Sequence, residues 1–485
     1  MVSALSIAVA KLGHEVKIVI PRYYSVERSS LKPIPGPMGV PMGNGEEWSA
    51  VYTDFLPGTK EKIQTFFIDH EIFFGRDGIY GTPAEPDFLD NPRRFMFFCK
   101  AVFQLCRKIG WYPDILHAHD WPSAMVPVYL KFAERPYKKE FAQTSSILTI
   151  HNLGYQGIYS KDNFDYSSLG WDVFYKAGFE DWNMINLLKA GLYSADKLNT
   201  VSPNYAEETK TQFFGFRLDG VLRYRSADYS GILNGIDTGV WNPEKDKLIP
   251  MPYSVKNMEG KAKAKLELQK EFGLPVDPKI PVFGMITRLT DQKGVGELFG
   301  PTYGSIWSLC REMNIQMVLI GTGESWCENE IKSLSSRLSN FKAKIMYSEK
   351  VSHLIEAGSD FFLMPSRYEP CGLNQMYSLN YGTLPIVRKT GGFIDTVENY
   401  DQKTGAGTGF MFNDLTPSAI FDTVGWAVWT WYNKPDHISD MRLRGMKKDF
   451  SWKTSAKKYL DLYDNAITMN SSSVNDQKPP VSQRD

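Results

Sequence analysis

Short runs of apolar residues recur along the first half of the chain, and stretches of helical composition separate them. The runs are KIVI (17–20), TFFI (65–68), ILHAH (115–119), ILTI (147–150) and LNTV (198–201). Uninterrupted apolar runs of this length are typical of strands whose two faces are both covered by helices. The pattern therefore predicts βαβ units and a parallel sheet.

The same alternation returns after Pro250. Its runs are PVFGMI (281–286), MVLIG (317–321), KIMY (344–347), FFLMP (361–365), LPIV (384–387) and GFMF (409–412). A polar segment with prolines at both ends and a helix-like centre, from about 257 to 272, separates the two halves. We therefore predict an α/β protein with two Rossmann-like domains, whose ligands bind in a cleft at the carboxyl ends of the strands.

The ends of the chain complete this plan. Residues 1–12 are expected to form a buried helix rather than a signal sequence, because they carry no basic leader. A strand normally precedes such a helix, so the first strand is expected to be missing. We place the N-terminal domain at 1–243 and the C-terminal domain at 244–449. A helix over 450–467 is expected to pack back on the N-terminal domain, and the tail 468–485 to be disordered.

The composition of the chain indicates which classes of partner and which cellular compartment to expect. The 55 lysines and arginines balance 55 aspartates and glutamates, so the chain has no net field to attract nucleic acid or an anionic membrane. No stretch approaches the roughly 18 apolar residues of a membrane span. The five cysteines are scattered without a Cys-x-x-Cys pair, and their odd number indicates a reducing compartment. We expect a cytoplasmic protein with neither nucleic acid nor a membrane as partner.

Two patterns in the C-terminal half suggest phosphate binding. Arg288 and Lys293 follow the run 281–286, and two cations at a strand's carboxyl end can bind a diphosphate. After the run 384–387 comes Thr390-Gly391-Gly392, where glycines let backbone amides approach a phosphate at a helix start. Each pattern alone also fits an ordinary exposed loop or turn. Their presence in one predicted domain favours the phosphate interpretation.

Glu369 lies between these two patterns, directly after the run 361–365. A carboxylate beside Pro370 and Gly372 could accept hydrogen bonds from sugar hydroxyls. A helix-capping glutamate is the alternative interpretation. Asn234, near the end of the first domain, is a similar case: it is either a cleft residue or the start of an Asn-Gly turn.

Histidines mark two strand ends in the N-terminal half. His117 and His119 lie on one face of a predicted strand, and His151 directly follows the next run, 147–150. A zinc site would need a third ligand at motif spacing, and the sequence offers none, so we expect no metal. A hydrogen-bonded histidine pair is the simpler interpretation.

A hydrolase with paired carboxylates is a second possible class of enzyme, because Asp120, Asp237 and Glu369 all lie at predicted strand ends. Retaining hydrolases place an acid and a nucleophile about 5–5.5 Å apart. The sequence does not give that distance. Such an enzyme would have no use for two phosphate-binding patterns, so the hydrolase is disfavoured.

Taken together, the motifs of the whole chain resemble those of bacterial glycogen synthases and plant starch synthases. They are HAHDW (117–121), IHNLGYQG (150–157), NTVSPNYAEE (199–208), ILNGIDTGVWNP (232–243), TRLTDQKG (287–294), GTGE (321–324), PSRYEPCGLNQ (365–375), YGTLPIVRKTGG (381–392) and GTGF (407–410). The resemblance extends from residue 1 to about 467, and EPCGL together with YGTLP-x-VR-x-TGG is its most specific part.

The resemblance implies a type B glycosyltransferase fold, in which two Rossmann-like domains face a cleft. It implies transfer of glucose from ADP-glucose to the 4-hydroxyl at the non-reducing end of an α-1,4-glucan, with retention of configuration and without a metal or other cofactor. The domain 1–243 would bind the glucan and the domain 244–449 the nucleotide sugar. The location would be the cytoplasm, or the plastid in a plant or alga.

The resemblance also assigns residues by their place in the motifs. The expected catalytic residues are His151, Arg288, Lys293 and Glu369, and the expected substrate-binding residues are Asp120, Asn234, Cys371, Gly372, Tyr377, Thr390, Gly391 and Gly392.

On the donor side, Arg288 and Lys293 would bind the diphosphate, with the amides at 390–392 as further donors. Glu369 would contact the donor glucose. Tyr377 would lie near the nucleotide.

Around the sugars, Cys371 and Gly372 would form the wall beside the donor glucose. His151 would lie close to the reacting sugar. Asn234 would touch the donor glucose or phosphate, and Asp120 would support the acceptor side.

The sequence departs from the pattern of related transferases in two places. Tyr377 occupies the position of a second glutamate found in the wider group, which favours the synthase branch. The family's N-terminal strand and its Lys-Thr-Gly-Gly-Leu loop would precede Met1, so we expect the chain that starts at Met1 to bind ADP-glucose weakly. An alternative is a catalytically impaired glucan-binding or assembly subunit, but the retained charged residues favour an enzyme.

Overall fold

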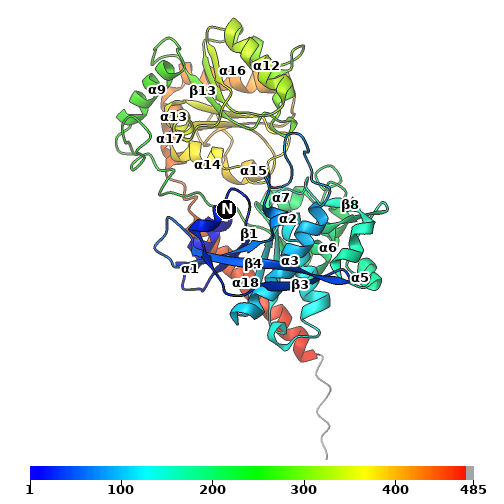
Figure 1. The fold of residues 1–485 in the computed structure, drawn as a ribbon. Coiled ribbons are helices and arrows are strands. Elements are labelled where there is room, and N and C mark those ends of the chain that lie inside the picture. The colour runs from blue at the N-terminus through cyan, green and yellow to red at the C-terminus, as the bar shows by residue number, and fades with distance from the viewer. Residues whose placement is uncertain (477–485) are drawn as a thin grey trace, which may run out of the picture. The chain divides into compact units, whose positions relative to one another are not determined.

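The computed structural model describes residues 1–476, which form two compact units (Figure 1). Unit 1 contains Met1–Val201, Ala206–Ile232 and the described part of the segment that begins at Ser455. Unit 2 contains Ser202–Tyr205 and Leu233–Thr454. The chain thus leaves unit 1 after Ile232 rather than after residue 243.

The physical reason for the earlier boundary is the packing of Trp241. Its ring stacks between those of His353 and Tyr377, with centroid distances of 3.9 and 4.0 Å. Both neighbours belong to unit 2. This aromatic packing attaches the segment after Ile232 to unit 2.

Unit 1 is built from many short elements. Its helices are α1 (Val2–Ala10), η1 (Arg28–Ser30), α2 (Glu71–Phe74), α3 (Asn91–Ile109), η2 (Trp121–Ser123), α4 (Met125–Tyr129), η3 (Leu130–Glu134), η4 (Lys139–Phe141), η5 (Lys161–Ser167), α5 (Trp171–Lys176), α6 (Leu187–Ser194), α7 (Pro203–Glu208), whose first residues belong to unit 2, α8 (Asp219–Tyr224), η6 (Ser226–Asp228) and most of α18 (Trp452–Asp476). Its strands are β1 (Lys17–Pro21), β2 (Lys32–Pro33), β3 (Met38–Met42), β4 (Gly45–Phe55), β5 (Gln64–Asp69), β6 (Ile115–His119), β7 (Ser145–Ile150), β8 (Ile158–Ser160), β9 (Glu180–Asp181), β10 (Met184–Asn186), β11 (Lys197–Thr200) and β12 (Tyr229–Gly231).

The central sheet of unit 1 has the order β12-β11-β7-β6, and all its strands are parallel. Three of the predicted apolar runs form β6, β7 and β11. Every residue of β7 is buried, which explains why its sequence shows no polar alternation. The carboxyl ends of β6 and β7 carry the histidines and Asp120.

A second sheet of unit 1 is mixed, and here the prediction of parallel strands alone was wrong. β1 and β5 are parallel, but β4 pairs antiparallel with β5, β3 and β2. β3 and β4 form a hairpin whose turn contains Gly43 at a φ of +55°. Because β4 is largely exposed, its polar residues hid it from a search for apolar runs. A small third sheet has the order β8-β10-β9.

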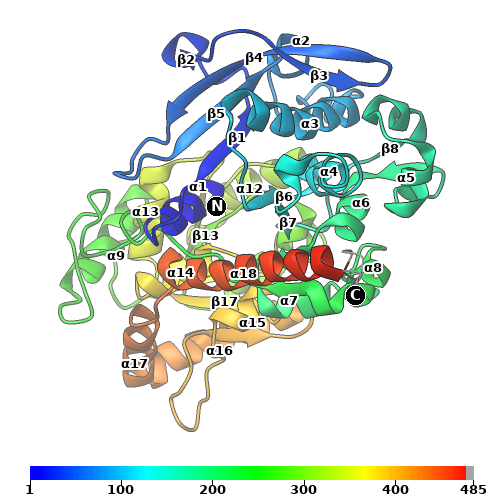
Figure 2. The ribbon, with the colours of Figure 1, turned by 90° about the horizontal axis from the view of Figure 1, so that it is seen from below.

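Helix α18 is the red helix of Figure 2, and three polar side chains of the central sheet bond it to unit 1. The Tyr463 hydroxyl lies 2.8 Å from Nδ1 of His117. Asn199 donates to the Tyr459 hydroxyl at 3.2 Å, and Ser145 donates to the carbonyl of Ala466 at 3.1 Å. These bonds join the expected last helix to β6, β7 and β11.

The same helix corrects the expected start of a disordered tail. α18 continues to Asp476, so residues 468–476 are helical. The side chain of Asn470 is buried and faces the carbonyls of Ala142 and Thr144, which gives this polar stretch a reason to be ordered. Residues 477–485 lie outside the described part of the chain.

Unit 2 contains one larger sheet between layers of helices. Its helices are α9 (Glu259–Glu271), η7 (Asp291–Lys293), α10 (Val295–Phe299), α11 (Ile306–Glu312), α12 (Ser325–Arg337), α13 (Glu349–Gly358), α14 (Asn374–Asn380), α15 (Gly392–Thr396), α16 (Pro417–Asn433) and α17 (Pro435–Met446). Its strands are β13 (Val282–Ile286), β14 (Gln316–Ile320), β15 (Phe341–Lys344), β16 (Phe361–Met364), β17 (Leu384–Arg388) and β18 (Phe410–Phe412).

The strands of unit 2 are all parallel, in the order β15-β14-β13-β16-β17-β18. Alternate residues of β13 face opposite layers. Val282 belongs to a core cluster with residues of α9 and α13, whereas Phe283 and Met285 belong to one with residues of α10, α11, α12 and α16. Burial on both faces explains the continuous apolar runs. The predicted strand 344–347 was misplaced, because β15 ends at Lys344.

No helix within residues 1–476 combines the length and the apolar composition that crossing a membrane requires.

The contact between α18 and β6 generates a prediction on stability. Tyr463→Phe should lower the free energy of unfolding by about 1–2 kcal/mol, because it leaves a partly buried imidazole nitrogen of His117 without its partner. Urea denaturation measures the change. Tyr137→Phe, at a tyrosine that is 75% exposed, is the control and should change little. Equal midpoints for the parent and Tyr463→Phe would contradict the proposed anchoring.

Candidate active site

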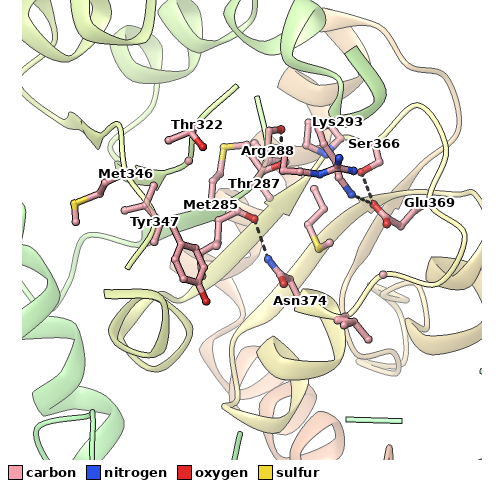
Figure 3. A pocket seen from close by; sticks show the side chains of 18 residues that line it. Met285, Thr287, Arg288, Lys293, Thr322, Met346, Tyr347, Ser366, Glu369 and Asn374 are labelled. Carbon is pink, nitrogen blue, oxygen red and sulfur yellow. Dashed lines mark hydrogen bonds and ion pairs between the residues drawn. The ribbon is translucent and has the colours of Figure 1, made fainter. Parts of the chain in front are cut away.

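A cavity of about 300 Å³ opens at the carboxyl ends of β13, β14 and β16 in unit 2 (Figure 3). Arg288, Lys293 and Glu369 line it, and Met346 and Tyr347 line it as well. In Figure 3 the charged side chains gather at one side of the cavity and the two apolar ones at the other. The cavity therefore offers a charged part and a part suited to a planar or apolar group.

An ion pair occupies the charged side. Nζ of Lys293 lies 2.5 Å from Oε2 of Glu369, and the hydroxyl of Ser366 donates to the same oxygen at 3.0 Å. Both partners of the ion pair are largely buried. Arg288 is exposed, and its guanidinium reaches Gln292 at 3.5 Å, which is long for a hydrogen bond. Its charge is therefore available to a ligand.

Gly294 brings the loop of Lys293 against the loop of Glu369. Its φ is +68°, and a Cβ atom there would lie 1.9 Å from the carbonyl oxygen of Pro365. Any other residue would clash with the backbone at this point. The glycine that follows Lys293 in the sequence thus permits the close approach that forms the ion pair.

The turn at Thr390-Gly391-Gly392 packs on the backbone of Glu369. Gly391 has a φ of +46°, and a Cβ atom there would lie 1.9 Å from the Glu369 carbonyl oxygen. The amide of Gly392 donates to that oxygen at 3.0 Å, and the amide of Thr390 donates to Arg388 at 2.9 Å. These two predicted phosphate donors are engaged within the protein. The turn as seen here holds Glu369 in place.

Cys371 and Asn234 lie together beside this turn. The Cys371 thiol is close to the backbone amide of Asn234, and burial raises the pKa of the thiol to about 12, so it stays neutral. The side-chain oxygen Oδ1 of Asn234 is buried and has no hydrogen-bond partner among the described residues. An unsatisfied buried acceptor is unfavourable, and a ligand donor would relieve it. Gly372 lines the cavity itself.

Tyr377 and Tyr347 lie differently with respect to the cavity. Tyr377 stacks on Trp241 and is not among the described residues that line the cavity. Tyr347 lines the cavity and is 79% exposed, although the sequence placed it inside a strand. Ser348, which caps α13 by accepting from the amide of Val351, was the signal that could have ended that strand earlier.

In unit 1, Asp120 and His151 meet at the ends of β6 and β7. Oδ1 of Asp120 accepts from the amides of His151 at 2.7 Å and Asn152 at 3.4 Å. Asp120 has a φ of +57°, which is unusual for a residue with a side chain. Burial raises the pKa of Asp120 to about 7 and lowers that of His151 to about 4. The imidazole of His151 is therefore neutral at pH 7.

The three histidines of this edge lie ring against ring. The centroids of His117 and His119 are 4.1 Å apart, and Nδ1 of His119 lies 3.2 Å from Nε2 of His151. Nε2 of His117 lies 2.6 Å from the Thr149 hydroxyl. Within residues 1–476 no group of three or more His, Cys, Asp or Glu side chains is arranged to hold a metal ion.

Comparison with known proteins identifies the family. Residues 1–224 match the starch synthase catalytic domain, and residues 267–428 match the glycosyl transferases of group 1. The glycogen synthase of Treponema denticola is 58% identical over 96% of this chain and 94% of its own. Glycogen synthase 1 of Geobacter metallireducens is 44% identical over 96% of this chain and 92% of its own. The chain belongs to the glycogen and starch synthase family.

Solved structures agree with this membership. The catalytic domain of starch synthase IV from Arabidopsis thaliana, bound to ADP and acarbose, superimposes with a TM-score of 0.85 at 29% identity and covers 96% of this chain and 95% of its own. Sucrose-phosphate synthase from Thermosynechococcus elongatus, at 16% identity and a TM-score of 0.55, shares the fold.

Membership confirms the predicted type B glycosyltransferase fold and the predicted class of enzyme. This synthase transfers glucosyl units in glucan synthesis. Nothing in the comparisons supports the alternative of an impaired binding or assembly subunit. The roles of the individual residues stay predictions.

The buried carboxyl of Asp120 predicts a pH-dependent stability of the synthase. Between about pH 4 and pH 7 the folded state keeps a proton on Asp120 that the unfolded state releases, so stability falls as the pH rises through this window. Asp120→Asn keeps an acceptor oxygen and cannot ionise. Its stability relative to the parent should therefore rise between pH 5 and pH 8, by on the order of 1–4 kcal/mol.

Urea denaturation at the two pH values tests this expectation. The lowered pKa of His151 makes its own contribution to stability rise with pH. This contribution is present in both proteins and cancels in the comparison. Asp54→Asn is the matched control, because Asp54 also accepts a backbone amide but is exposed. Parallel pH profiles for Asp120→Asn and the parent would refute the buried, protonated state.

The Gly391 turn generates a prediction on activity. Gly391→Ala should lower kcat by about 10²-fold, because the new Cβ must displace the backbone of Glu369, and a shift of about 1 Å in a catalytic group has an effect of this size. Gly273→Ala is the matched control. Gly273 also has a positive φ, but a Cβ atom there meets nothing within 4 Å. A kcat of Gly391→Ala that is no lower than that of Gly273→Ala would contradict a role of the clash at Glu369.

Proposed function

We propose that this synthase transfers glucose from ADP-glucose to the 4-hydroxyl at the non-reducing end of an α-1,4-glucan, with retention of the α configuration. The observation that carries the proposal is the buried Lys293–Glu369 pair at the cavity, with the exposed charge of Arg288 beside it. The ADP and acarbose bound to starch synthase IV, and the names of the bacterial relatives, support the choice of substrates.

In this proposal Arg288 and Lys293 bind the diphosphate of the donor. When the bond from the glucose C1 to the diphosphate breaks, its electron pair goes to the departing ADP, and the two cations stabilise that negative charge. C1 bonds to the 4-oxygen of the acceptor, and the proton of that hydroxyl passes to the departing phosphate. Preorganised protein cations would take the part that a metal plays in other nucleotide-sugar enzymes. The amides of Thr390, Gly391 and Gly392 would add donors after exchanging their present partners.

The nucleotide base would bind at the opposite side of the cavity. Tyr347 presents an exposed ring there, and Met346 lies beside it. Aromatic rings stack favourably on planar bases. Tyr377, whose ring is stacked on Trp241, would lie near the nucleotide behind the residues that line the cavity.

The donor glucose would lie next to Glu369, which would accept hydrogen bonds from its hydroxyls. Cys371 and Gly372 would form the adjacent wall. Oδ1 of Asn234 would accept from a further hydroxyl of the sugar or stay near the phosphate, and either contact would satisfy its buried, unpaired oxygen.

The acceptor glucan would be bound by unit 1. His151, as a neutral imidazole, would hydrogen-bond the reacting sugar. Asp120, which fixes the backbone of His151, would support the acceptor side. We also propose a cytoplasmic location, because all five cysteines are buried free thiols, as suits a reducing compartment.

The proposal predicts the effect of removing either cation. Arg288→Ala and Lys293→Ala should each lower turnover with ADP-glucose by about 10²–10³-fold, with a smaller effect on the affinity for glycogen. Glucose transfer to glycogen and glycogen binding are measured on each purified variant. Lys270→Ala removes an exposed cation of α9 and is the control. Turnover within threefold of the parent in both cation variants would sink the diphosphate role.

A further inference from the structure

The Lys293–Glu369 pair joins two loops that follow different strands. Lys293 lies in the turn η7 after β13, and Glu369 lies in the loop 365–373 after β16. The Lys293–Glu369 pair can hold a fixed geometry at the cavity only if the two loops do not shift along each other. The structure contains a second cross-link between the same loops, and it lies two residues before the first.

That second cross-link is made by Arg367. Its Nε and Nη2 atoms donate to the two carboxylate oxygens of Asp291 at 3.1 and 3.0 Å. Asp291 precedes Lys293 by the same two residues by which Arg367 precedes Glu369. Between the two side-chain links, the backbone amide of Arg367 donates to the carbonyl of Gln292 at 2.8 Å. The segments 291–293 and 367–369 therefore lie side by side and are joined by two side-chain pairs and one backbone hydrogen bond.

Arg367 is also held from its other sides. Its Nη2 donates to Glu297 of α10 at 2.7 Å. Its carbonyl accepts from Arg388, whose Nε donates to the carbonyl of Asn413 at 3.0 Å. Arg367, the second residue of the Ser-Arg-Tyr-Glu segment after β16, is thus tied to η7, α10 and β17 of unit 2.

This link between Arg367 and Asp291 contributes to the geometry of the two loops more than to the stability of the fold. Arg367 is 38% exposed and Asp291 is 72% exposed, and ion pairs with this exposure add little to stability because water screens them. A bidentate arginine–carboxylate pair nevertheless fixes distance and orientation together, which a lysine cannot do.

We propose that Arg367 is a positioning residue for glucosyl transfer, which sets the register of the two loops and thereby the placement of Lys293 and Glu369. Arg367 does not line the cavity among the described residues, so it acts through the other two. The inference rests on the proposed roles of Lys293 and Glu369.

The first test compares kinetics. Arg367→Ala should lower kcat with ADP-glucose by about 10–100-fold, the scale expected when a catalytic group is misplaced, while the melting temperature and the KM for glycogen change little. Asp291→Ala should have a similar effect, and Arg367→Lys should restore only part of the activity. Arg223→Ala is the matched control. Arg223 is also a partly exposed arginine that pairs with an aspartate, but it lies on α8 of unit 1.

The second test asks whether Arg367 acts through Lys293. In a Lys293→Ala background, adding Arg367→Ala should lower kcat by a clearly smaller factor than it does in the parent, because one of the two groups that Arg367 positions is already absent. Full additivity of the two effects would overturn the proposal. The proposal would also be overturned if Arg367→Ala lowered the glycogen affinity and the melting temperature together with kcat, because that result would indicate general unfolding.

The two levels of proposal fail differently. Near-parent turnover of Lys293→Ala would refute the proposed function of the ion pair. A strong defect in Lys293→Ala together with near-parent kinetics in Arg367→Ala would refute the positioning role alone. If Arg367→Ala does not fold, Arg367→Lys and Asp291→Ala decide between these outcomes by the same kinetic comparison.

Discussion

The Lys293–Glu369 ion pair is the interaction on which the rest of the site depends. It places a positive charge and a hydrogen-bond acceptor side by side in a cavity of about 300 Å³. Neither partner is fixed by its own strand, because both lie in loops beyond the strand ends. Gly294, Gly391 and Arg367 hold these loops together by close backbone approach and by directed hydrogen bonds. The chemistry of the site thus rests on backbone packing as much as on charge.

The polar side chains at the strand ends of unit 1 are kept neutral by burial, whereas the ion-paired side chains at the cavity of unit 2 are charged. His117, His119 and His151 are stacked at the ends of β6 and β7, where burial lowers the pKa of each imidazole and raises that of Asp120. Neutral groups in a row donate and accept hydrogen bonds without carrying net charge. Such an edge suits the recognition of sugar hydroxyls, whereas the paired charges of unit 2 suit a diphosphate.

Much of this arrangement was visible in the sequence, and the failures have a common cause. Runs buried on both faces, such as 147–150 and 282–286, were found because a continuous apolar stretch reports two covered faces. The hairpin of β3 and β4 was missed because β4 is largely exposed and polar, and because β3 alternates buried and less buried residues instead of forming a continuous apolar run. The strand end at Lys344 and the continuation of α18 to Asp476 depend on a helix cap and on the buried side chain of Asn470. Neither is expressed in local apolar content.

The sequence by itself determined the family, the two α/β domains, and the cations and carboxylate that meet at the cavity, because these are encoded in residue type and local spacing. Only the tertiary structure decided which residues touch. It paired Lys293 with Glu369, which are far apart in the chain, stacked Tyr377 on Trp241 and exposed Tyr347 at the cavity. It also cross-linked the two loops through Arg367. These outcomes depend on the order in which parallel strands lie side by side, and no local pattern carries that order.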